Sequence, residues 1–345
     1  HRLVFEMVLY STILINNNIN YIDASLKKDN FFNKKIINKI MNSFIFYKNI
    51  ISPDMRLFQY GDNDSGKFFD ITSKNEKDFQ KNLIELADHF FSIQSNSESI
   101  STLFINDTVD RSSFKYNRRN KENYILSKSS IFFPESKIYK YFNDNYTTLC
   151  VLRPVFLGHT HNDLFSFELF LKKEPIIVDG GSYCYTSNPS LRDKFRNTIN
   201  HNTLWINEKE QNELIGVFEI LKESKPSIEK ISKNQIIASH NGYKKKHSRE
   251  FIFEEKRMII KDHFVGDSFL SINFAPNIKI VPIDNSTIKI NSINSQLLFN
   301  LDNLEFLRLE DGNYSEGYGK MVQNKRLILK RVSPQTKLII NLKKN

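Results

Sequence analysis

The sequence predicts a multidomain α+β fold, in which a helical part comes first and a large antiparallel β-sandwich follows. Apolar residues in the first third recur at the three- and four-residue spacing of helices. The last two thirds instead show the alternation of half-buried strands, interrupted by turn residues. With 345 residues, the chain is long enough for two domains.

The helical part begins at the first residue. Residues 1–15 place apolar side chains on nearly every face, which predicts a buried helix that is too short to span a membrane. The chain starts at His1 without a Met or a signal-peptide cleavage site, so we expect it to begin inside a domain. Two later segments have helical spacing, with apolar positions at Ile36, Ile37, Ile40, Met41, Phe44 and Tyr47, and at Phe79, Leu83, Leu86, Ala87, Phe90 and Phe91.

Two polar stretches separate these elements. Residues Gly61–Gly66 have the composition of a loop between helices. Residues 106–123 contain few large aliphatic side chains and several basic ones, which predicts a linker. We therefore expect a helical domain over residues 1–105 and a β-domain over residues 124–345.

The β-sandwich is predicted from short segments with alternating apolar residues. These positions are Ile278, Ile280 and Ile283; Ile288 and Ile290; Leu327 and Leu329; Leu338 and Ile340. Turn residues punctuate them at Asp284-Asn285-Ser286, Asp311-Gly312-Asn313 and Ser333-Pro334. The sequence has no glycine-rich nucleotide-binding fingerprint and no internal repeat.

Composition says little about partners. A formal net charge of +10 favours an anionic ligand, although a lysine-rich composition is equally expected from an A/T-rich genome. No nucleic-acid-binding motif accompanies the basic run Lys244–Lys246, so a solvated turn is favoured and no nucleic-acid partner is predicted. The two cysteines, Cys150 and Cys184, cannot form a disulfide framework and are interpreted as buried free thiols rather than a single bridge.

Histidines concentrate in one region. His159 and His161 are two residues apart, and in a strand such residues share a face, so both rings can point at one site. Asp179 follows the buried strand Pro175–Val178, and a buried carboxylate needs a partner. His201 lies just before another apolar segment, Leu204-Trp205-Ile206.

Two histidines and one aspartate with a fourth position open suit zinc, because imidazole nitrogen and carboxylate oxygen are ordinary zinc ligands. The candidate ligands are His161, Asp179 and His201. The alternative is a set of hydrogen-bonded core histidines. Only the H-x-H spacing is locally specific.

The H-x-H pair is also typical of cupins, which are metal-dependent oxygenases and isomerases. A cupin needs a glutamate on the same face as the histidines. The nearest, Glu168, follows His161 by an odd offset, which on one strand places it on the opposite face. The cupin interpretation is therefore disfavoured.

A larger set of residues resembles a known family. Segments 158–169, 178–185, 191–198 and 201–203 together resemble the C-terminal signature of heparinase II/III-like polysaccharide lyases. Weaker similarity extends to Gly61–Gly66 and to the residues His240, Asn241, Gly242, Tyr243, His247 and Arg249. The resemblance implies the C-terminal part of an incomplete α/α toroid, followed by an antiparallel β-sandwich.

The resemblance also implies an activity, the cleavage of an acidic, uronate-containing polysaccharide by β-elimination. Such a lyase neutralises the substrate carboxylate, removes the weakly acidic proton beside it and protonates the leaving oxygen. By resemblance, His159 neutralises the carboxylate, and His161, Asp179 and His201 hold Zn²⁺ at an interdomain cleft.

Further substrate-binding candidates implied by the resemblance are Tyr185, Arg192 and Arg196. Each has a structural alternative, as a core residue for Tyr185 and as salt bridges that brace the loop leading to His201 for the two arginines. The resemblance places the proton-transferring toroid tyrosine just before residue 1. We therefore expect this chain to lack that tyrosine and to be inactive alone.

A function of a different class is a non-catalytic glycan-binding or surface-polysaccharide biosynthesis protein of the same fold. The upstream sequence would discriminate the two, since a tyrosine immediately before His1 favours the enzyme. Many lyases of this kind are periplasmic, which predicts a periplasmic or cell-envelope location, but a cytoplasmic relative would have the same sequence features. The sequence does not indicate an oligomeric state.

Overall fold

The computed structural model describes residues 2–22, 34–70, 73–91, 125–154, 158–221 and 224–343. The chain divides into two compact units. The first comprises residues 1–57 and 66–123, and the second comprises residues 58–65 and 124–345. The predicted linker, residues 106–123, lies outside the described residues.

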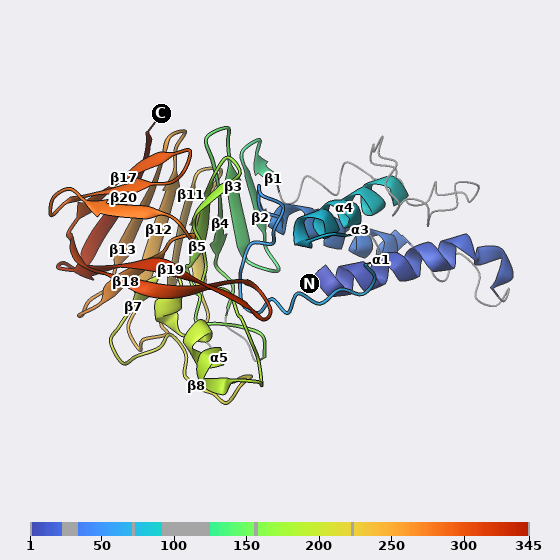
Figure 1. The fold of residues 1–345 in the computed structure, drawn as a ribbon, viewed down its shortest axis with the longest axis horizontal. Helices are drawn as coiled ribbons and strands as arrows, with labels where there is room; N and C mark the ends of the chain where they lie inside the picture. The colour runs from blue at the N-terminus through green and yellow to red at the C-terminus, as the bar shows by residue number, and fades with distance from the viewer. Residues whose placement is uncertain are drawn as a thin grey trace. The chain divides into compact units, whose positions relative to one another are not determined.

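The first unit contains the helices α1 (Arg2–Asn17), α3 (Lys34–Ile50) and α4 (Glu76–Phe90), with a short 3-10 helix, η1 (Ile19–Tyr21), after α1 (Figure 1). The predicted helical segments around residues 36–47 and 79–91 are confirmed. The Asn75 side chain caps α4 by accepting a hydrogen bond from the backbone N–H of Asp78, which satisfies one of the free donors at a helix start.

The first helix is not buried on every side. Phe5, Leu9 and Ile13 lie in a shared apolar core with α3 and α4, whereas Val4 and Leu14 are 64% and 61% exposed. The prediction of burial on all faces is wrong for the described residues, because α1 packs against α3 and α4 along one side. No helix in the described part of the chain is long and apolar enough to cross a membrane.

The second unit is built mainly from antiparallel strands. One sheet has six strands in sequence order, so each strand pairs with the next along the chain. Its strands are β1 (Ile125–Ser127), β2 (Ser130–Phe133), β3 (Ile138–Phe142), β4 (Tyr146–Val151), β5 (Phe167–Leu171) and β6 (Glu174–Ile177).

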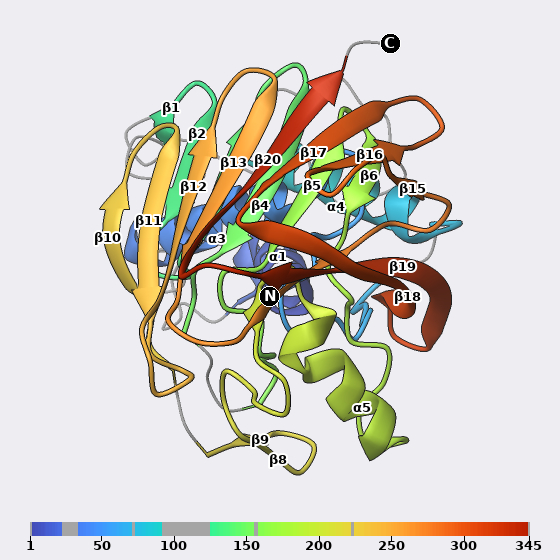
Figure 2. The ribbon, with the colours of Figure 1, turned by 90° about the vertical axis from the view of Figure 1, so that its left-hand side faces the viewer.

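The second sheet has eight strands and is seen face-on in Figure 2. Its order is β10 (Ser227–Ile231), β11 (Gln235–His240), β12 (His247–Phe253), β13 (Arg257–His263), β20 (Gln335–Lys343), β17 (Gln296–Asp302), β16 (Thr287–Asn291) and β15 (Lys279–Pro282). The C-terminal strand β20 therefore lies in the middle, between strands from two different hairpins.

The described residues of this unit also form two smaller sheets and two short helices. Four strands form the order β18 (Leu304–Gly317), β19 (Lys320–Arg331), β14 (Phe269–Asn273) and β7 (Leu204–Trp205). A two-stranded ribbon pairs β8 (Leu214–Ile215) with β9 (Glu219–Ile220). The helices are α5 (Pro189–Arg196) and the 3-10 helix η6 (Thr198–Asn200).

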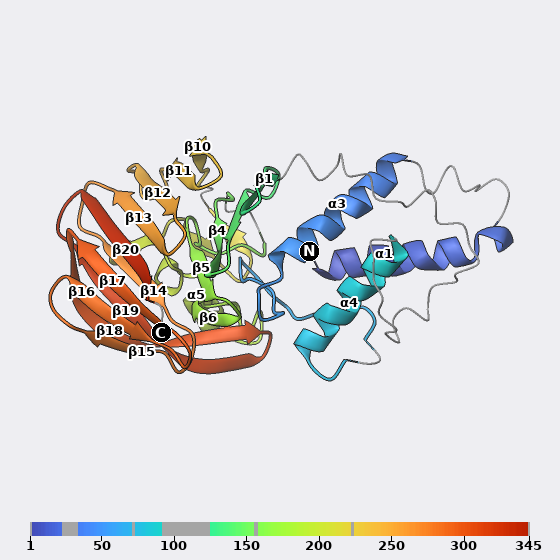
Figure 3. The ribbon, with the colours of Figure 1, turned by 90° about the horizontal axis from the view of Figure 1, so that it is seen from above.

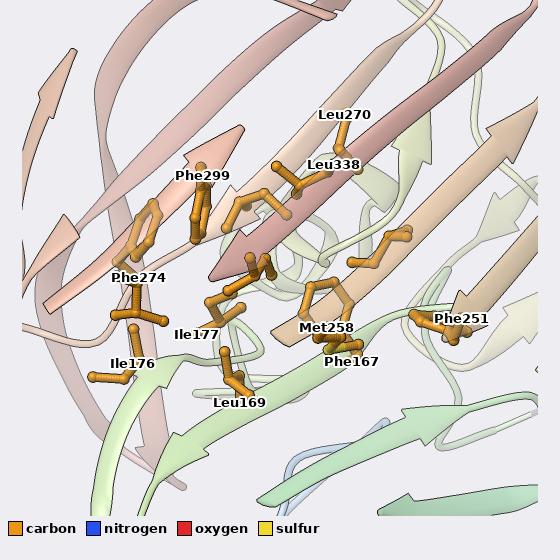
Figure 4. Packing of buried hydrophobic residues seen from close by; sticks show 14 of the residues in the cluster. Phe167, Leu169, Ile176, Ile177, Phe251, Met258, Leu270, Phe274, Phe299 and Leu338 are labelled. Carbon is orange, nitrogen blue, oxygen red and sulfur yellow. The ribbon is translucent and has the colours of Figure 1, made fainter. Parts of the chain in front are cut away.

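One apolar core joins the large sheets, and Figure 3 shows the six-stranded sheet in green beside the eight-stranded sheet. The rings of Tyr139 and Tyr141 on β3 stack on Phe253 of β12, with centroid distances of 5.2 and 5.0 Å. Figure 4 shows further side chains of this core, among them Phe167 and Phe251, whose rings meet edge-on. Each fully buried side chain of this size stabilises the fold by about 1.5–3 kcal/mol.

The predicted alternation is confirmed in β16 and β20 but not at every predicted position. In β19, Ile328 is buried together with Leu327 and Leu329, and Ile283 lies just after β15 and is 57% exposed. In β16 the buried residues Ile288 and Ile290 alternate with half-buried ones. The turns predicted at residues 284–286 and 333–334 do connect strands. Both cysteines are buried and free, as predicted.

The turn predicted at Asp311-Gly312-Asn313 is wrong. These residues lie inside the long strand β18, with Gly312 directly opposite Asn324 of β19. A side chain at Gly312 would place its Cβ 2.6 Å from the Asn324 side-chain oxygen, so glycine permits close contact between strands here. Local composition cannot distinguish this use of glycine from a turn.

Candidate functional site

The segment that holds His159 and His161 is not a strand, contrary to the prediction. It is an irregular connection between β4 and β5. Two of its backbone N–H groups donate outside the segment, Gly158 N–H to the Phe218 carbonyl between β8 and β9, and Asn162 N–H to the Arg196 carbonyl at the end of α5. The predicted sharing of one strand face is therefore wrong, and the His159 side chain is 68% exposed while that of His161 is fully buried.

Both rings nevertheless meet at one carboxylate, that of Asp62. His159 Nδ1 lies 2.8 Å from Asp62 Oδ2, and His161 Nε2 lies 2.8 Å from Asp62 Oδ1. Arg192 donates to both oxygens of the same carboxylate. Burial alone would raise the pKa of Asp62, but the hydrogen bonds and charges of His161 and Arg192 outweigh it and hold the pKa below its ordinary value.

Asp62 belongs to a segment that we call the strap, residues 58–65, which forms part of the β-unit although helices precede and follow it in sequence. Three backbone groups fasten it: Asp62 N–H donates to the His159 carbonyl, Asn63 N–H donates to Ser182 Oγ, and Gln59 N–H donates to the Glu168 carboxylate. Sequence patterns predicted a loop here but did not identify Asp62. The only signal was its position in the segment that weakly resembles the family.

The hydrogen bond to Asp62 determines which nitrogen of His161 is free. A carboxylate only accepts, so His161 Nε2 is the protonated nitrogen and Nδ1 carries the lone pair. Burial lowers the pKa of His161, although the hydrogen bond and charge of Asp62 oppose this shift. Nδ1 is buried and has no hydrogen-bond partner among the described residues.

His201 is held in the same manner by Asp179. Its Nδ1 donates to Asp179 Oδ2 at 2.8 Å, and its Nε2 is buried without a hydrogen-bond partner in the described part of the chain. Burial lowers the pKa of His201, but the charge and hydrogen bond of Asp179 outweigh it, so the net shift is upward. Asp179 also accepts hydrogen bonds from Ser166 Oγ and from the backbone N–H of Gly181, each at 3.1 Å.

The two histidines fit a metal role better than the full set of three predicted ligands does. The ring centroids of His161 and His201 are 5.4 Å apart, and each ring has one free nitrogen while a carboxylate holds the other. This is the usual outer arrangement around a metal-binding histidine. Within the described residues, however, no group of three or more His, Cys, Asp or Glu side chains lies where it could hold a metal ion, and the Asp179 carboxylate is occupied by its hydrogen bonds.

Aromatic rings border the exposed histidine. His159 lies 5.7 Å from the ring of Tyr185 and 5.3 Å from the ring of Phe218, and Tyr185 meets Tyr318 at 5.2 Å. Arg192 packs its guanidinium on the rings of Tyr185 and Phe218. Burial, with a smaller contribution from the charge of Asp62, raises the pKa of Tyr185 above its ordinary range.

The predicted substrate-binding arginines lie on one face of α5. The helix begins with Asn188 as its cap and Pro189 in its first turn, which suits a helix start. Residues four apart share a helix face, so Arg192 and Arg196 point the same way. Both side chains are fully buried, and Arg196 donates to backbone carbonyls at residues 216, 217 and 219. These contacts brace the loop that carries Phe218, and direct contact with a substrate remains a prediction.

A second histidine cluster lies deeper in the sandwich. His240 bonds to His247 at 3.0 Å, and His247 bonds to Asp262 at 2.7 Å. Arg249 donates to both oxygens of Asp262 and to the backbone carbonyl of Asn202. Because Asn202 directly follows His201, this buried network also supports the segment that positions His201.

Comparisons with known proteins agree with this architecture. A family model described as heparinase II/III-like, C-terminal, matches residues 126–342. The structure of heparan sulfate lyase HepC from Pedobacter heparinus is similar with a TM-score of 0.68 and 15% identity, covering 99% of this chain and 52% of that one. A structure described as heparinase III is similar with a TM-score of 0.65 and 14% identity, covering 97% of this chain and 51% of that one. No curated protein sequence matches significantly.

At these identities the structural matches establish the fold alone. The predicted architecture, helices followed by large antiparallel sheets, is confirmed. This chain spans about half the length of the solved structures that it matches.

Proposed function

This chain belongs to the heparinase II/III-like family through its C-terminal domain, and on that premise we propose that it forms part of a lyase that cleaves an acidic, uronate-containing polysaccharide by β-elimination. The observation that supports this proposal most directly is the exposed ring of His159, held at Nδ1 by the ionised carboxylate of Asp62. This leaves Nε2 available to an external ligand.

The chemistry of β-elimination explains why such a histidine is useful. The proton to be removed lies beside a carboxylate, and its removal adds negative charge to a group that is already anionic. In its imidazolium form, His159 would donate Nδ1–H to Asp62 and Nε2–H to the substrate carboxylate, which neutralises that charge. His159 therefore serves charge stabilisation, and proton transfer requires other groups.

The surroundings of His159 suit a sugar ring. Tyr185 and Phe218 are half-buried, and Tyr318 is 41% exposed, so each ring retains accessible surface. Aromatic rings offer rigid apolar area together with a polar edge in the case of tyrosine. A net charge of +10 raises the local concentration of an acidic glycan.

We also propose Zn²⁺ at the buried pair of histidines, with Asp179 as the third residue of the set. The free nitrogens, His161 Nδ1 and His201 Nε2, are chemically suited to Zn²⁺. A bound Zn²⁺ would supply positive charge near His159 and hold the two imidazoles in place. In this structure Asp179 orients His201, and its role as a direct ligand would require its carboxylate to exchange that hydrogen bond for the metal.

A second candidate function is glycan binding without cleavage, in surface-polysaccharide biosynthesis. Tyr185 is the predicted site tyrosine next to His159, and burial raises its pKa, so its phenol keeps its proton near neutral pH and does not supply a base. A site that neutralises and stacks a uronate without a base would bind the glycan only. For either function, family analogy leads us to propose a periplasmic or cell-envelope location.

The test uses the protein in which this chain occurs, incubated with a panel of uronate-containing polysaccharides. Lyase activity produces an unsaturated uronate, which is followed by its ultraviolet absorbance at a turnover of about 1–1000 s⁻¹. Binding by calorimetry without product formation would support the second candidate. Neither binding nor product on any acidic glycan would contradict both proposals.

A further inference from the structure

Asp62 contacts three residues of the candidate site that the sequence identified. Its two oxygens are shared among His159, His161 and Arg192, and its side chain is 2% exposed. We propose that Asp62 is a positioning residue that sets the tautomer and orientation of both histidines at once, which makes the strap a working part of the site. The test of this inference by enzyme activity rests on the lyase function proposed above. The test by NMR of the histidine tautomers is independent of that function.

The argument begins with the chemistry of a carboxylate. Each oxygen of an ionised carboxylate only accepts hydrogen bonds, so each histidine must present an N–H to it. His159 then carries a proton on Nδ1 and directs Nε2 away from Asp62. His161 carries a proton on Nε2 and keeps its lone pair on the buried Nδ1. The Asp62 side chain thereby leaves His159 Nε2 free to face an external ligand and His161 Nδ1 free to bind a metal.

Arg192 makes this arrangement depend on Asp62. Its Nη1 lies 3.3 Å from His161 Nε2, close enough to become a direct donor to that nitrogen. With Asp62 present, Arg192 donates to the carboxylate instead. Without the carboxylate, Nε2 would accept from Arg192, and the proton of the neutral ring would move to Nδ1. The nitrogen suited to a metal would then be an N–H.

If Asp62 had a merely structural role and only fastened the strap, Asp62→Asn would leave the tautomers of both histidines unchanged. The strap is also held by bonds that do not use the Asp62 side chain, including Asn63 N–H to Ser182 Oγ at 2.9 Å and Tyr318 N–H to Ser65 Oγ at 3.0 Å. Asp62→Asn keeps the size of the side chain and these anchors. It replaces one acceptor oxygen by an NH₂ donor, so one of the two histidines must accept rather than donate.

The first experiment reads the tautomers directly. The protein has eight histidines, so nitrogen NMR on protein labelled only at histidine, with His159→Gln and His161→Gln for assignment, can resolve both rings. In the parent we expect the neutral His159 to be protonated at Nδ1 and the neutral His161 at Nε2. In Asp62→Asn we expect one of them to switch. Opposite tautomers in the parent, or no switch in the variant, would overturn the inference.

The second experiment compares Asp62→Asn with Asp302→Asn, which removes the same charge from a partly exposed aspartate on β17, outside the candidate site. We expect Asp62→Asn to lower kcat/KM mainly through kcat, and to weaken Zn²⁺ binding, each by about 10- to 100-fold, as is usual when an outer hydrogen-bond partner is lost. Asp302→Asn should stay within about twofold of the parent, below the usual effect of losing such a partner. Equal losses in the two variants would contradict the positioning role of Asp62.

The two proposals can fail separately. If the parent shows no lyase activity but its histidines have the expected tautomers and one switches in Asp62→Asn, the positioning role stands and the lyase proposal falls. If the parent is an active lyase and its tautomers are opposite to those expected, the positioning role falls and the lyase proposal stands. The parent tautomers are read without Asp62→Asn, so failure of that variant to fold does not prevent the decision.

Discussion

Asp62 and His159 are 97 positions apart in the chain, yet Asp62 Oδ2 lies 2.8 Å from His159 Nδ1. The contact joins a segment flanked by helices in sequence to an irregular connection between two strands of the sandwich. It is reinforced from the backbone, where Asp62 N–H donates to the His159 carbonyl at 3.0 Å. The exposed side chain of His159 is thus held by a residue far from it in sequence.

Zinc content should depend on the two buried histidines. We expect about one Zn²⁺ per chain in the parent and none in His161→Ala or His201→Ala, measured by elemental mass spectrometry. Both variants should also melt at lower temperature, because a metal that binds only the folded state stabilises it. Asp179→Ala should lose Zn²⁺ too, through a lost ligand or a misoriented His201.

The matched control for zinc is His159→Ala, which removes an exposed histidine two residues from His161. It should retain the metal. Equal loss of Zn²⁺ in all four variants, or a parent without any metal, would contradict the assignment of the buried pair.

Replacement of His159 should affect activity and not stability. We expect His159→Gln to lower kcat/KM by about 100- to 1000-fold, the usual effect of removing a group that stabilises developing charge. Because the side chain is 68% exposed, the free energy of unfolding should change by less than about 0.5 kcal/mol. His263→Gln, at an exposed histidine on β13, is the control for both quantities. A His159→Gln variant with parental kcat/KM would exclude the proposed charge-neutralising role.

The strap should tolerate no side chain at Gly61. This residue has a φ of +70°, and an added Cβ would lie 2.5 Å from the backbone oxygen of His159. Gly319 has a similar φ of +73° but no atom within 4 Å of such a Cβ. Gly319→Ala should therefore cost about 1–2 kcal/mol from backbone strain alone, and Gly61→Ala should cost more and lower kcat/KM as well. Urea unfolding measures the loss in the free energy of unfolding for each variant. Equal losses would show that the strap moves to accommodate the added Cβ at Gly61.

The buried ion pair of Asp262 and Arg249 should contribute far more to the free energy of unfolding than an exposed ion pair does. Asp262 is paired with Arg249, and both side chains are almost fully buried. Asp262→Ala leaves a buried guanidinium without its carboxylate, so we expect a loss of about 3–5 kcal/mol in the free energy of unfolding. Asp302→Ala breaks a partly exposed pair with Lys337 and should cost less than about 1 kcal/mol. Similar losses in the two variants would mean that the Asp262 site rearranges.

The second histidine cluster should make the fold sensitive to mild acid. Burial lowers the pKa of His240 and of His247 below the value of an unfolded chain, near 6.5. The unfolded chain therefore binds protons at these positions that the folded chain does not, and stability falls as pH drops below about 6.5.

Urea unfolding at several pH values between about 5 and 7.5 measures this dependence. We expect the decline toward low pH to be shallower in His247→Gln than in the parent, because one of the titrating groups is gone. A steeper decline in the variant would contradict the assignment of a lowered pKa to His247.

The sequence alone was sufficient for the order of the two parts of the chain, helical first and β-stranded second, and for several of their elements. The helices around residues 36–47 and 79–91 and strands such as β16 and β20 followed from the spacing of apolar residues. This information is local. In a helix every third or fourth side chain lies on the same face, and in a strand every second one does, so the spacing of apolar residues along the chain indicates the element. The family resemblance, carried by short polar segments, was likewise recognisable without a structure.

Only the tertiary structure decided how the candidate site is assembled. It separated the exposed His159 from the buried His161, paired Asp179 with His201, and brought Asp62 to both members of the H-x-H pair. The strap contacts depend on chain segments about a hundred positions apart, and local spacing contains no information about which distant segments meet. The physical reason is that a buried carboxylate must find a donor, but which donor it finds is determined by the packing of the whole fold.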